Sequence, residues 1–160
     1  MHTTVSIEVG QEAPDFTLRG PGGIPVSLSE YRGQKNVVLV FFPLAFSPVC
    51  AHQLPQVQKD VPRFDDLDAV VLGVSVDSHH ANRAFAEQLG LSFPLLSDFQ
   101  REVSATHGVL NAARGYSGRA LFVIDKHGHI IHKDVSPNSG DVAQIPGNEN
   151  AIVALRAAGA

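Results

Sequence analysis

The stretch Val37-Val38-Leu39-Val40-Phe41-Phe42 is apolar at every position. β-Branched and aromatic residues favour strands, and a strand that is buried on both faces of a sheet shows no alternation of apolar and polar residues. A second run of this type spans residues 70–76. The segment between the two runs allows a helix over residues 51–64, which Pro55 and Pro62 are expected to kink or interrupt. Two buried strands joined by a crossover helix predict an α/β fold.

Weaker patterns on both sides of this unit predict the remaining elements. They are an N-terminal β-hairpin (residues 16–18 and 24–28), a helix that Ser78 caps and Gly90 ends, a strand–turn–strand unit (120–124 and 130–133) and a terminal helix (150–158). A polar loop is expected over residues 136–147. Together these elements predict a single domain of residues 1–160, in which helices flank a mixed central sheet.

The composition indicates a globular protein and no nucleic-acid or membrane partner. Hydrophobic residues make up 44% of the 160 residues and charged residues 18%, and the net charge is −4. A negatively charged chain has no electrostatic reason to bind nucleic acid or an anionic membrane surface. No apolar run approaches the roughly 18 residues that a membrane-spanning helix requires. The first residues lack the basic start and the apolar stretch of a signal peptide, so a cytoplasmic location is expected.

The chain contains one cysteine, Cys50. An intrachain disulfide is therefore impossible, which fits a reducing compartment, and a zinc site built on several cysteines is excluded. A lone cysteine is more often a small buried apolar residue than a reactive one. The residues around Cys50 must decide between these two interpretations.

The position of Cys50 favours a reactive thiol. The strand that ends at Pro43 is followed by a short loop and then by the expected helix, so that Cys50 lies in the first helical turn. Unpaired amides and the positive end of the helix dipole lie in that turn, and both favour a thiolate over a thiol. Ser47 precedes Cys50 by three residues and can direct its hydroxyl toward the same point. Its alternative role is that of a helix N-cap.

The pattern Pro43-x-x-x-Ser47-x-x-Cys50 resembles the active-site motif of peroxiredoxins, Pro-x-x-x-(Thr/Ser)-x-x-Cys. Further blocks in the same order resemble the family: residues 13–18, 39–43, 74–78, 93–98 and 118–125. The resemblance covers residues 8 to 135, and the absence of a second cysteine is most similar to the one-cysteine, AhpE-like subgroup.

This resemblance implies a thioredoxin-like fold and a thiol-dependent reduction of hydrogen peroxide and organic hydroperoxides. It places Ser47, Arg119 and the Cys50 amide around the peroxide, with Pro43 shielding the site from water. The thiolate of Cys50 would become a sulfenic acid. Since no second cysteine is present, a low-molecular-weight thiol would resolve it, followed by a glutaredoxin-like or thioredoxin-like reductant. A homodimer formed near the active-site loops is also implied, and no cofactor or metal is expected.

Two positions depart from the family pattern. Ser47 lacks the methyl group of the more usual threonine, so its hydroxyl is expected to be less firmly oriented. Gln53 stands where many relatives have glutamate. An amide can hydrogen-bond to an arginine but cannot form an ion pair with it, and it adds no negative charge to oppose the thiolate.

Other candidate residues are given structural or solvated roles. No cysteine or carboxylate at ligand spacing completes a metal site with His127, His129 and His132. His52 is close enough in sequence to tune Cys50, but a helix is expected to point it away. The remaining residues fall into three sets: a loop role rather than the lining of the site entrance for Arg114 and Tyr116, core packing rather than a pocket collar for Phe42, Phe46 and Phe93, and solvated helix charges for Arg83 and Arg101.

Two other functions remain open at this point. In the first, oxidation of Cys50 switches an interaction surface, so that the protein is a peroxide sensor or a chaperone-like partner with little turnover. The second is a thiol–disulfide oxidoreductase, but that chemistry usually requires Cys-x-x-Cys, and Ser47 stands where the first sulfur would be.

Overall fold

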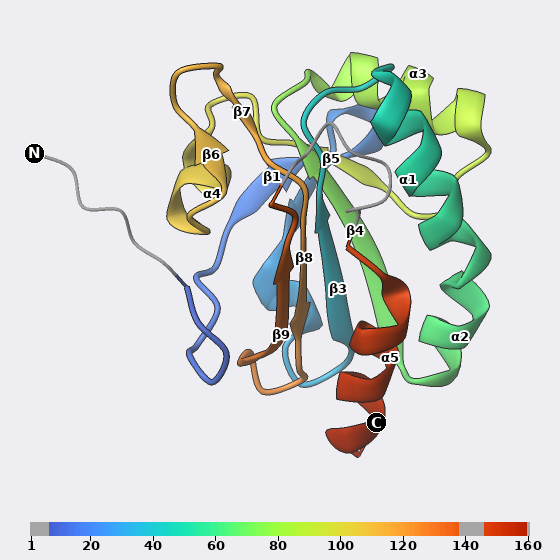
Figure 1. The fold of residues 1–160 in the computed structure, drawn as a ribbon, viewed down its shortest axis with the longest axis vertical. Coiled ribbons are helices and arrows are strands. Elements are labelled where there is room, and N and C mark those ends of the chain that lie inside the picture. The colour runs from blue at the N-terminus through green and yellow to red at the C-terminus, as the bar shows by residue number, and fades with distance from the viewer. Residues whose placement is uncertain (1–6, 138–145, 160) are drawn as a thin grey trace, which may run out of the picture.

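A seven-stranded mixed sheet forms the centre of the computed structural model, which describes residues 7–137 and 146–159 (Figure 1). The strand order is β2-β1-β5-β4-β3-β8-β9. The strands are β1 (Thr17–Arg19), β2 (Pro25–Ser27), β3 (Asn36–Phe41), β4 (Ala69–Ser75), β5 (Leu95–Ser97), β8 (Ala120–Ile124) and β9 (Ile130–Val135). Two further strands, β6 (Leu110–Asn111) and β7 (Tyr116–Ser117), form a separate small hairpin. The predicted α/β architecture with a mixed sheet is confirmed.

Strand β3 lies between β4, to which it is parallel, and β8, to which it is antiparallel. Its six residues are all buried, as the unbroken apolar pattern predicts. Successive side chains of a strand point to opposite faces, so β3 contributes to two separate cores. Val38 and Val40 belong to the core on one face, and Leu39 and Phe41 belong to the core on the other.

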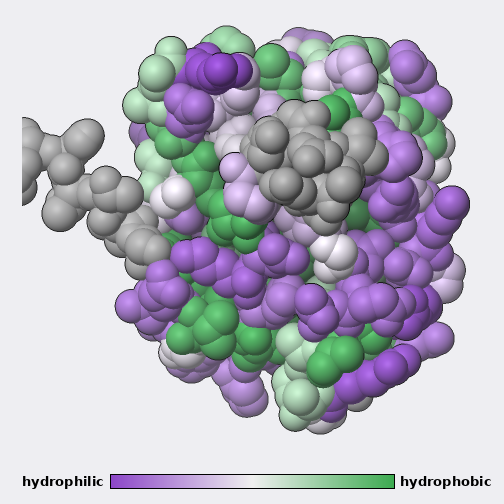
Figure 2. Space-filling model, in the orientation of Figure 1, coloured by the Kyte–Doolittle hydropathy of each residue, from purple (hydrophilic) through white to green (hydrophobic). Residues whose placement is uncertain are grey.

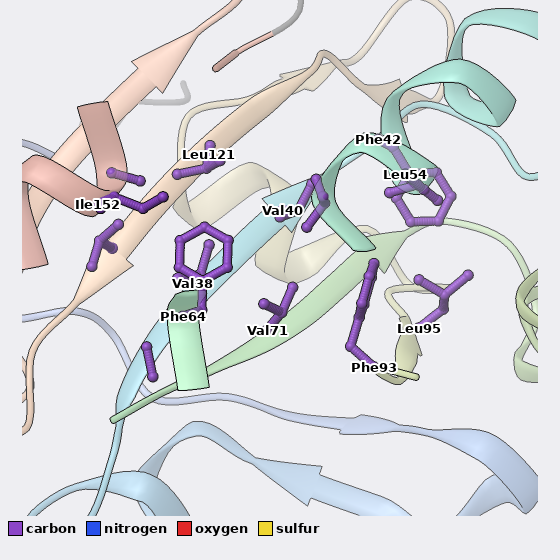
Figure 3. Close-up of a cluster of buried hydrophobic side chains, with 14 of the residues drawn as sticks. Val38, Val40, Phe42, Leu54, Phe64, Val71, Phe93, Leu95, Leu121 and Ile152 are labelled. Carbon is purple, nitrogen blue, oxygen red and sulfur yellow. The ribbon is translucent and has the colours of Figure 1, made fainter. Parts of the chain in front are cut away.

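Helices cover both faces of the sheet. They are α1 (Pro48–Lys59), α2 (Val61–Asp66), α3 (His79–Leu89), α4 (Glu102–Thr106) and α5 (Asn148–Ala157), with two 3₁₀ turns, η1 (Pro21–Gly23) and η2 (Leu28–Tyr31). On the face shown in Figure 3, Leu54 of α1, Phe64 of α2 and Ile152 of α5 pack against Val38 and Val40 of β3. The opposite face is covered by the N-terminal segment, η2 and α4. The helix that carries Cys50 is thus anchored to the centre of the sheet.

The two prolines of the crossover segment behave differently. Pro62 lies in the first turn of α2, where a backbone N–H would have no partner within the helix, so its absence costs no hydrogen bond. The helical conformation is interrupted at Asp60, between α1 and α2. Pro55 lies inside α1, which continues to Lys59. An interruption is therefore confirmed near Pro62, whereas α1 continues through Pro55, where burial of the neighbouring Leu54 holds the helix against the core.

The outer elements agree with the sequence in kind, and two short ones were not expected. The N-terminal hairpin, the helix α3, the β8–β9 hairpin and the terminal helix are all present. The sequence pattern identified neither β5 nor the β6–β7 hairpin. Strands of two or three residues are too short for periodicity alone to identify them, and the N-terminal hairpin was recognised with the help of its turn, Gly20-Pro21-Gly22-Gly23. Most of the loop predicted over residues 136–147 lies outside the described residues.

Figure 2 shows one face of the surface, on which hydrophilic residues form a broad band between smaller hydrophobic patches. Such a mixture of surface types is usual for a folded protein in water. Within the described ranges, no helix combines the length and the apolar character that crossing a bilayer requires.

Candidate active site

The loop from β3 to α1 delivers Cys50 to the end of the sheet. It begins at the buried Pro43, and Phe46 adopts a left-handed conformation (φ 67°) before the extended Ser47. The first intrahelical bond runs from the amide of Ala51 to the carbonyl of Ser47, at 2.9 Å. Cys50 is the third residue of α1 and is fully buried. Its predicted place in the first turn is confirmed.

The guanidinium of Arg119 contacts the sulfur of Cys50. Arg119 directly precedes β8, whose first residue, Ala120, pairs with Phe41 at the end of β3. This register places Arg119 beside the start of the Cys50 loop, and its Nη1 atom lies 3.0 Å from Sγ of Cys50. Both side chains are buried. The guanidinium therefore places a positive charge and a hydrogen-bond donor directly against the sulfur.

Gln53 holds the same guanidinium from one helical turn further along α1. Its Oε1 atom accepts a hydrogen bond from Nη1 of Arg119 at 2.8 Å, and its side chain is buried. The amide thus orients the arginine by a hydrogen bond between a neutral and a charged group. This contact answers the question raised by the departure from glutamate, because Gln53 positions Arg119 without placing a second anion beside the sulfur.

The hydroxyl of Ser47 donates to the carbonyl of Leu44 at 2.9 Å. Ser47 occupies the N-cap position of α1, but its side chain accepts no bond from the first turn of the helix. The alternative role of a side-chain cap is therefore wrong. In the described part of the chain no hydrogen bond joins Ser47 to Cys50, and Ser47 is one of the residues that line the cavity described below.

Asp77, which follows β4, fixes the loop before Cys50. Its Oδ2 atom accepts hydrogen bonds from the amide of Ala45, at 2.7 Å, and from the hydroxyl of Ser75, at 2.8 Å. Sequence reasoning placed Asp77 only inside a block of family resemblance and assigned it no role. A usable signal was present, since a carboxylate directly after a parallel strand lies at the same sheet edge as the residues that follow the neighbouring strand.

A cavity of about 500 Å³ opens beside this site. Its walls include Pro43, Ser47 and Arg119, together with Arg114 and Tyr116 from the β6–β7 hairpin. Arg114 lies in the turn before β7 and Tyr116 lies in β7, and both line the cavity, which is the alternative role considered for them. Cys50 is not among the lining residues, so Arg119 is the residue that both lines the cavity and contacts the sulfur.

The remaining candidates lie away from the sulfur. His52 is exposed on α1 and its Nε2 atom lies 2.8 Å from Nε2 of Gln56. Phe42 packs in the core, and Phe46 is half exposed with its ring 5.0 Å from that of Phe85. Neither lines the cavity, so core packing explains Phe42, whereas Phe46 instead rests on α3.

Arg101 does not act as a solvated helix charge. It precedes α4 in a left-handed conformation (φ 65°), and its Nε atom donates to the carbonyl of Gly115 at 2.6 Å. Its Nη1 atom donates to the carbonyl of Phe99 at 3.1 Å. Arg101 therefore ties the turn of the β6–β7 hairpin to α4.

A sequence profile described as the AhpC/TSA family matches residues 9–133, which is most of the chain. The chain is a peroxiredoxin of this family. This membership identifies it as a thiol peroxidase, and its single cysteine is consistent with a one-cysteine mechanism.

Relatives of the peroxiredoxin agree with this assignment. It is 44% identical to alkyl hydroperoxide reductase E of Mycobacterium tuberculosis over 126 residues, which cover 78% of this chain and 82% of that one. It is 38% identical to peroxiredoxin Bcp of Bacillus subtilis over 133 residues, covering 79% and 84% of the two chains. The solved structure of Mycobacterium tuberculosis AhpC superposes with a TM-score of 0.84 at 29% identity, covering 97% of this chain and 94% of that one. The thioredoxin-like fold implied by the sequence motifs is confirmed.

Proposed function

We propose that Cys50 is the peroxidatic residue, and the contact of 3.0 Å between Arg119 Nη1 and Cys50 Sγ carries this proposal. The thiolate attacks the terminal oxygen of a hydroperoxide, so that an S–O bond forms while the O–O bond breaks. Sulfur is oxidised to a sulfenic acid, and the departing alkoxide takes up a proton to become an alcohol, or water when the substrate is hydrogen peroxide.

Arg119, Ser47 and Pro43 have distinct roles in this step. The guanidinium of Arg119 stabilises both the thiolate and the negative charge that builds on the departing oxygen. Ser47 lies at the cavity wall, and its oxygen can accept a hydrogen bond from the bound peroxide. Pro43 is buried at the start of the loop and excludes water from the sulfur. Gln53 keeps the guanidinium in place.

The reducing half of the cycle requires sulfur from another molecule, because Cys50 is the chain's one cysteine. A low-molecular-weight thiol condenses with the sulfenic acid, which forms a mixed disulfide and releases water. A second thiol, supplied by a glutaredoxin-like or thioredoxin-like protein, then attacks this disulfide and releases Cys50 in the reduced form. Each cycle transfers two electrons from thiols to the peroxide.

A cytoplasmic homodimer is the working form in this proposal. The surface near the active-site loop offers Leu44 and Phe46, two large apolar residues that are exposed in a single chain. Apolar residues grouped at a surface are typical of protein interfaces. Sedimentation at micromolar concentration is expected to give the mass of a pair, and a monomer under these conditions would exclude the dimer.

Intact mass spectrometry tests the catalytic proposal. Peroxide together with excess small thiol is expected to add one thiol per chain, whereas excess peroxide alone carries Cys50 on to a sulfinic acid. The Cys50→Ser variant is the control and should show neither change. A disulfide-linked dimer as the main product under both conditions would contradict the mechanism.

A further inference from the structure

The cavity beside Cys50 has a positive character on a chain of net charge −4. Two arginines, Arg114 and Arg119, line it, and no aspartate or glutamate is among its described lining residues. Part of the remaining wall is apolar and includes Leu44, Val49 and Pro137. Two cations and an apolar wall suit a molecule that has an apolar body and a negative group.

The two arginines occupy different depths. Arg119 is buried against the sulfur, whereas Arg114 is exposed on the turn between β6 and β7. The guanidinium of Arg114 donates one hydrogen bond, from Nη1 to the hydroxyl of Tyr116, at 3.2 Å. Among the described residues no carboxylate lies within ion-pair distance of it. Most of its five N–H donors are therefore available to an anion.

The hairpin that carries Arg114 is held from two sides. The register of β6 and β7 pairs Asn111 with Tyr116. Arg101 donates a hydrogen bond to the carbonyl of Gly115, which lies between Arg114 and Tyr116. The hydroxyl of Ser117 donates to the carbonyl of Phe42 at the end of the central strand, at 3.2 Å. Arg114 thus stands at a defined place relative to the Cys50 loop.

We propose that Arg114, supported by Tyr116, binds the carboxylate of an organic reactant whose reactive group reaches Cys50. This inference rests on the proposed function, because the other end of the reactant must be a hydroperoxide or a thiol. A guanidinium recognises a carboxylate through two parallel hydrogen bonds, and the apolar wall contacts the carbon chain between the two ends. Arg114 then selects among reactants that Arg119 and Cys50 would otherwise treat alike.

The oxidising arm of the test compares linoleic acid hydroperoxide with its methyl ester, which differs in the carboxylate alone. The chain has no tryptophan, so rapid quenching and mass measurement of trapped sulfenic acid give the rate constants. We expect the acid-to-ester ratio of rate constants to fall about fivefold in Arg114→Gln, as for loss of a partly exposed charged contact. Arg114→Lys, which keeps the charge, should recover part of the ratio.

The reducing arm compares 3-mercaptopropionate with neutral 2-mercaptoethanol, each rate being expressed per thiolate. If Arg114→Gln lowers the acid-to-ester ratio alone, the carboxylate belongs to the peroxide, and if it lowers the ratio of the two thiols alone, the carboxylate belongs to the thiol. If both ratios fall, Arg114 binds the carboxylates of both reactants. Arg83→Gln is the matched control, because it removes the same charge from exposed α3, where Arg83 pairs with Glu87. It should leave both ratios unchanged.

Two results would overturn the role of Arg114 alone, and a third, distinguishable result would overturn the proposed function. If the unaltered protein is oxidised by acid and ester, and the ratios in both arms are the same in Arg114→Gln, only the role of Arg114 fails. Equal falls in Arg83→Gln and Arg114→Gln would also exclude a local site and leave a general effect of charge. If neither hydroperoxide oxidises Cys50, the proposed function itself fails.

Discussion

Helices α1 and α3 follow the neighbouring parallel strands β3 and β4, and each begins after a serine. In α3 the hydroxyl of Ser78 accepts a hydrogen bond from the amide of Ala81 at 3.2 Å. In α1 the hydroxyl of Ser47 turns back to the carbonyl of Leu44, and no side chain caps the helix. The same residue at the same position thus closes one helix start and leaves the other open for the sulfur of Cys50.

The closed helix start supports the open one. Asp77 belongs to the turn between β4 and α3, and its carboxylate holds the amide of Ala45 in the loop before α1. The hydroxyl of Ser75 bonds both to Asp77 and, at 3.0 Å, to the buried Asn82 of α3. A hydrogen-bonded chain therefore links the body of α3 to the Cys50 loop. The start of α1, which no side chain caps, is thus connected to the neighbouring start of α3 by these hydrogen bonds.

The largest effect on the peroxide rate is expected from the variant Arg119→Lys, which changes the side chain that contacts Cys50 at the start of α1. Lysine keeps the charge but has neither the planar shape nor the several donors of a guanidinium. We expect the rate of peroxide reduction to fall by about 100-fold, as when one donor to a developing anion is removed. Rates should be measured at a pH where Cys50 is ionised in both proteins. Equal rates for the two proteins at that pH would mean that Arg119 stabilises the thiolate and has no effect on the departing oxygen.

Breaking the link between the two helix starts is the next test. Asp77→Ala removes the acceptor for the amide of Ala45, and we expect a fall of about tenfold in the peroxide rate because the loop loses its fixed geometry. Hydrogen exchange at the amide of Ala45 should become faster at the same time.

Asp77→Asn keeps a carbonyl oxygen for the amide of Ala45 and serves as the control. Partial recovery of the rate and of amide protection is expected in this variant. If Asp77→Ala accelerates exchange at Ala45 and leaves the rate unchanged, the loop geometry does not limit catalysis.

The two serines themselves allow the comparison to be made directly. Ser78→Ala should lower the free energy of unfolding by about 1 kcal/mol, because a helix cap is lost, and should change the peroxide rate little. Ser47→Ala should leave stability nearly unchanged and slow the reaction several-fold, because an acceptor at the cavity wall is lost. Urea unfolding and rapid-quench rates give the four values. The opposite pattern would mean that Ser47 is the structural cap.

The smallest predicted effect concerns the pH dependence of stability and a histidine at the C-terminal end of α4. His107 follows α4, and its Nδ1 atom lies 2.8 Å from the carbonyl of Val103, among the rings of Phe16, Phe41 and Phe122. Burial lowers the pKa of His107 below its usual value of 6.5. The unfolded chain therefore takes up the proton first, and stability that is present above about pH 6.5 is lost as the pH falls.

The variant His107→Asn tests this, because it keeps a side-chain donor and removes the titration. Urea unfolding at pH 7.5 and at pH 5.5 should show a smaller difference in stability for the variant than for the unaltered chain. Burial also lowers the pKa of His132, so part of the pH dependence should persist. An unchanged difference would exclude His107 as its source.

The sequence predicted the features that depend on local patterns. Continuous apolar character identified β3 and β4, and the spacing of Pro43, Ser47 and Cys50 located the helix start. The position of Arg119 beside the sulfur followed from family resemblance, and the structure places it there. The strands and the helix start need no knowledge of which distant segments meet, whereas the contact of Arg119 with Cys50 joins residues 69 apart in the chain and was predicted from the resemblance alone.

The features that escaped prediction depend on contacts between segments far apart in the chain. Asp77 acts on Ala45 across 32 residues, and the hairpin with Arg114 is held by Arg101, which directly precedes α4. The direction of the Ser47 hydroxyl was also open. A serine that precedes a helix can accept a hydrogen bond from an amide of the first helical turn, or it can donate one to a preceding carbonyl such as that of Leu44. Only the folded arrangement decides between such partners.

The pairing of Phe41 with Ala120 also limits how the chain length can vary. Cys50 and Arg119 are 69 residues apart in the chain, and the register between β3 and β8 brings them together. One residue inserted in either strand would shift Arg119 by about 3.3 Å along the sheet and turn the following side chains to the opposite face. Insertions and deletions in related chains should therefore be absent from β3 and β8 and should collect in turns far from the sulfur, such as the one at Gly128 between β8 and β9.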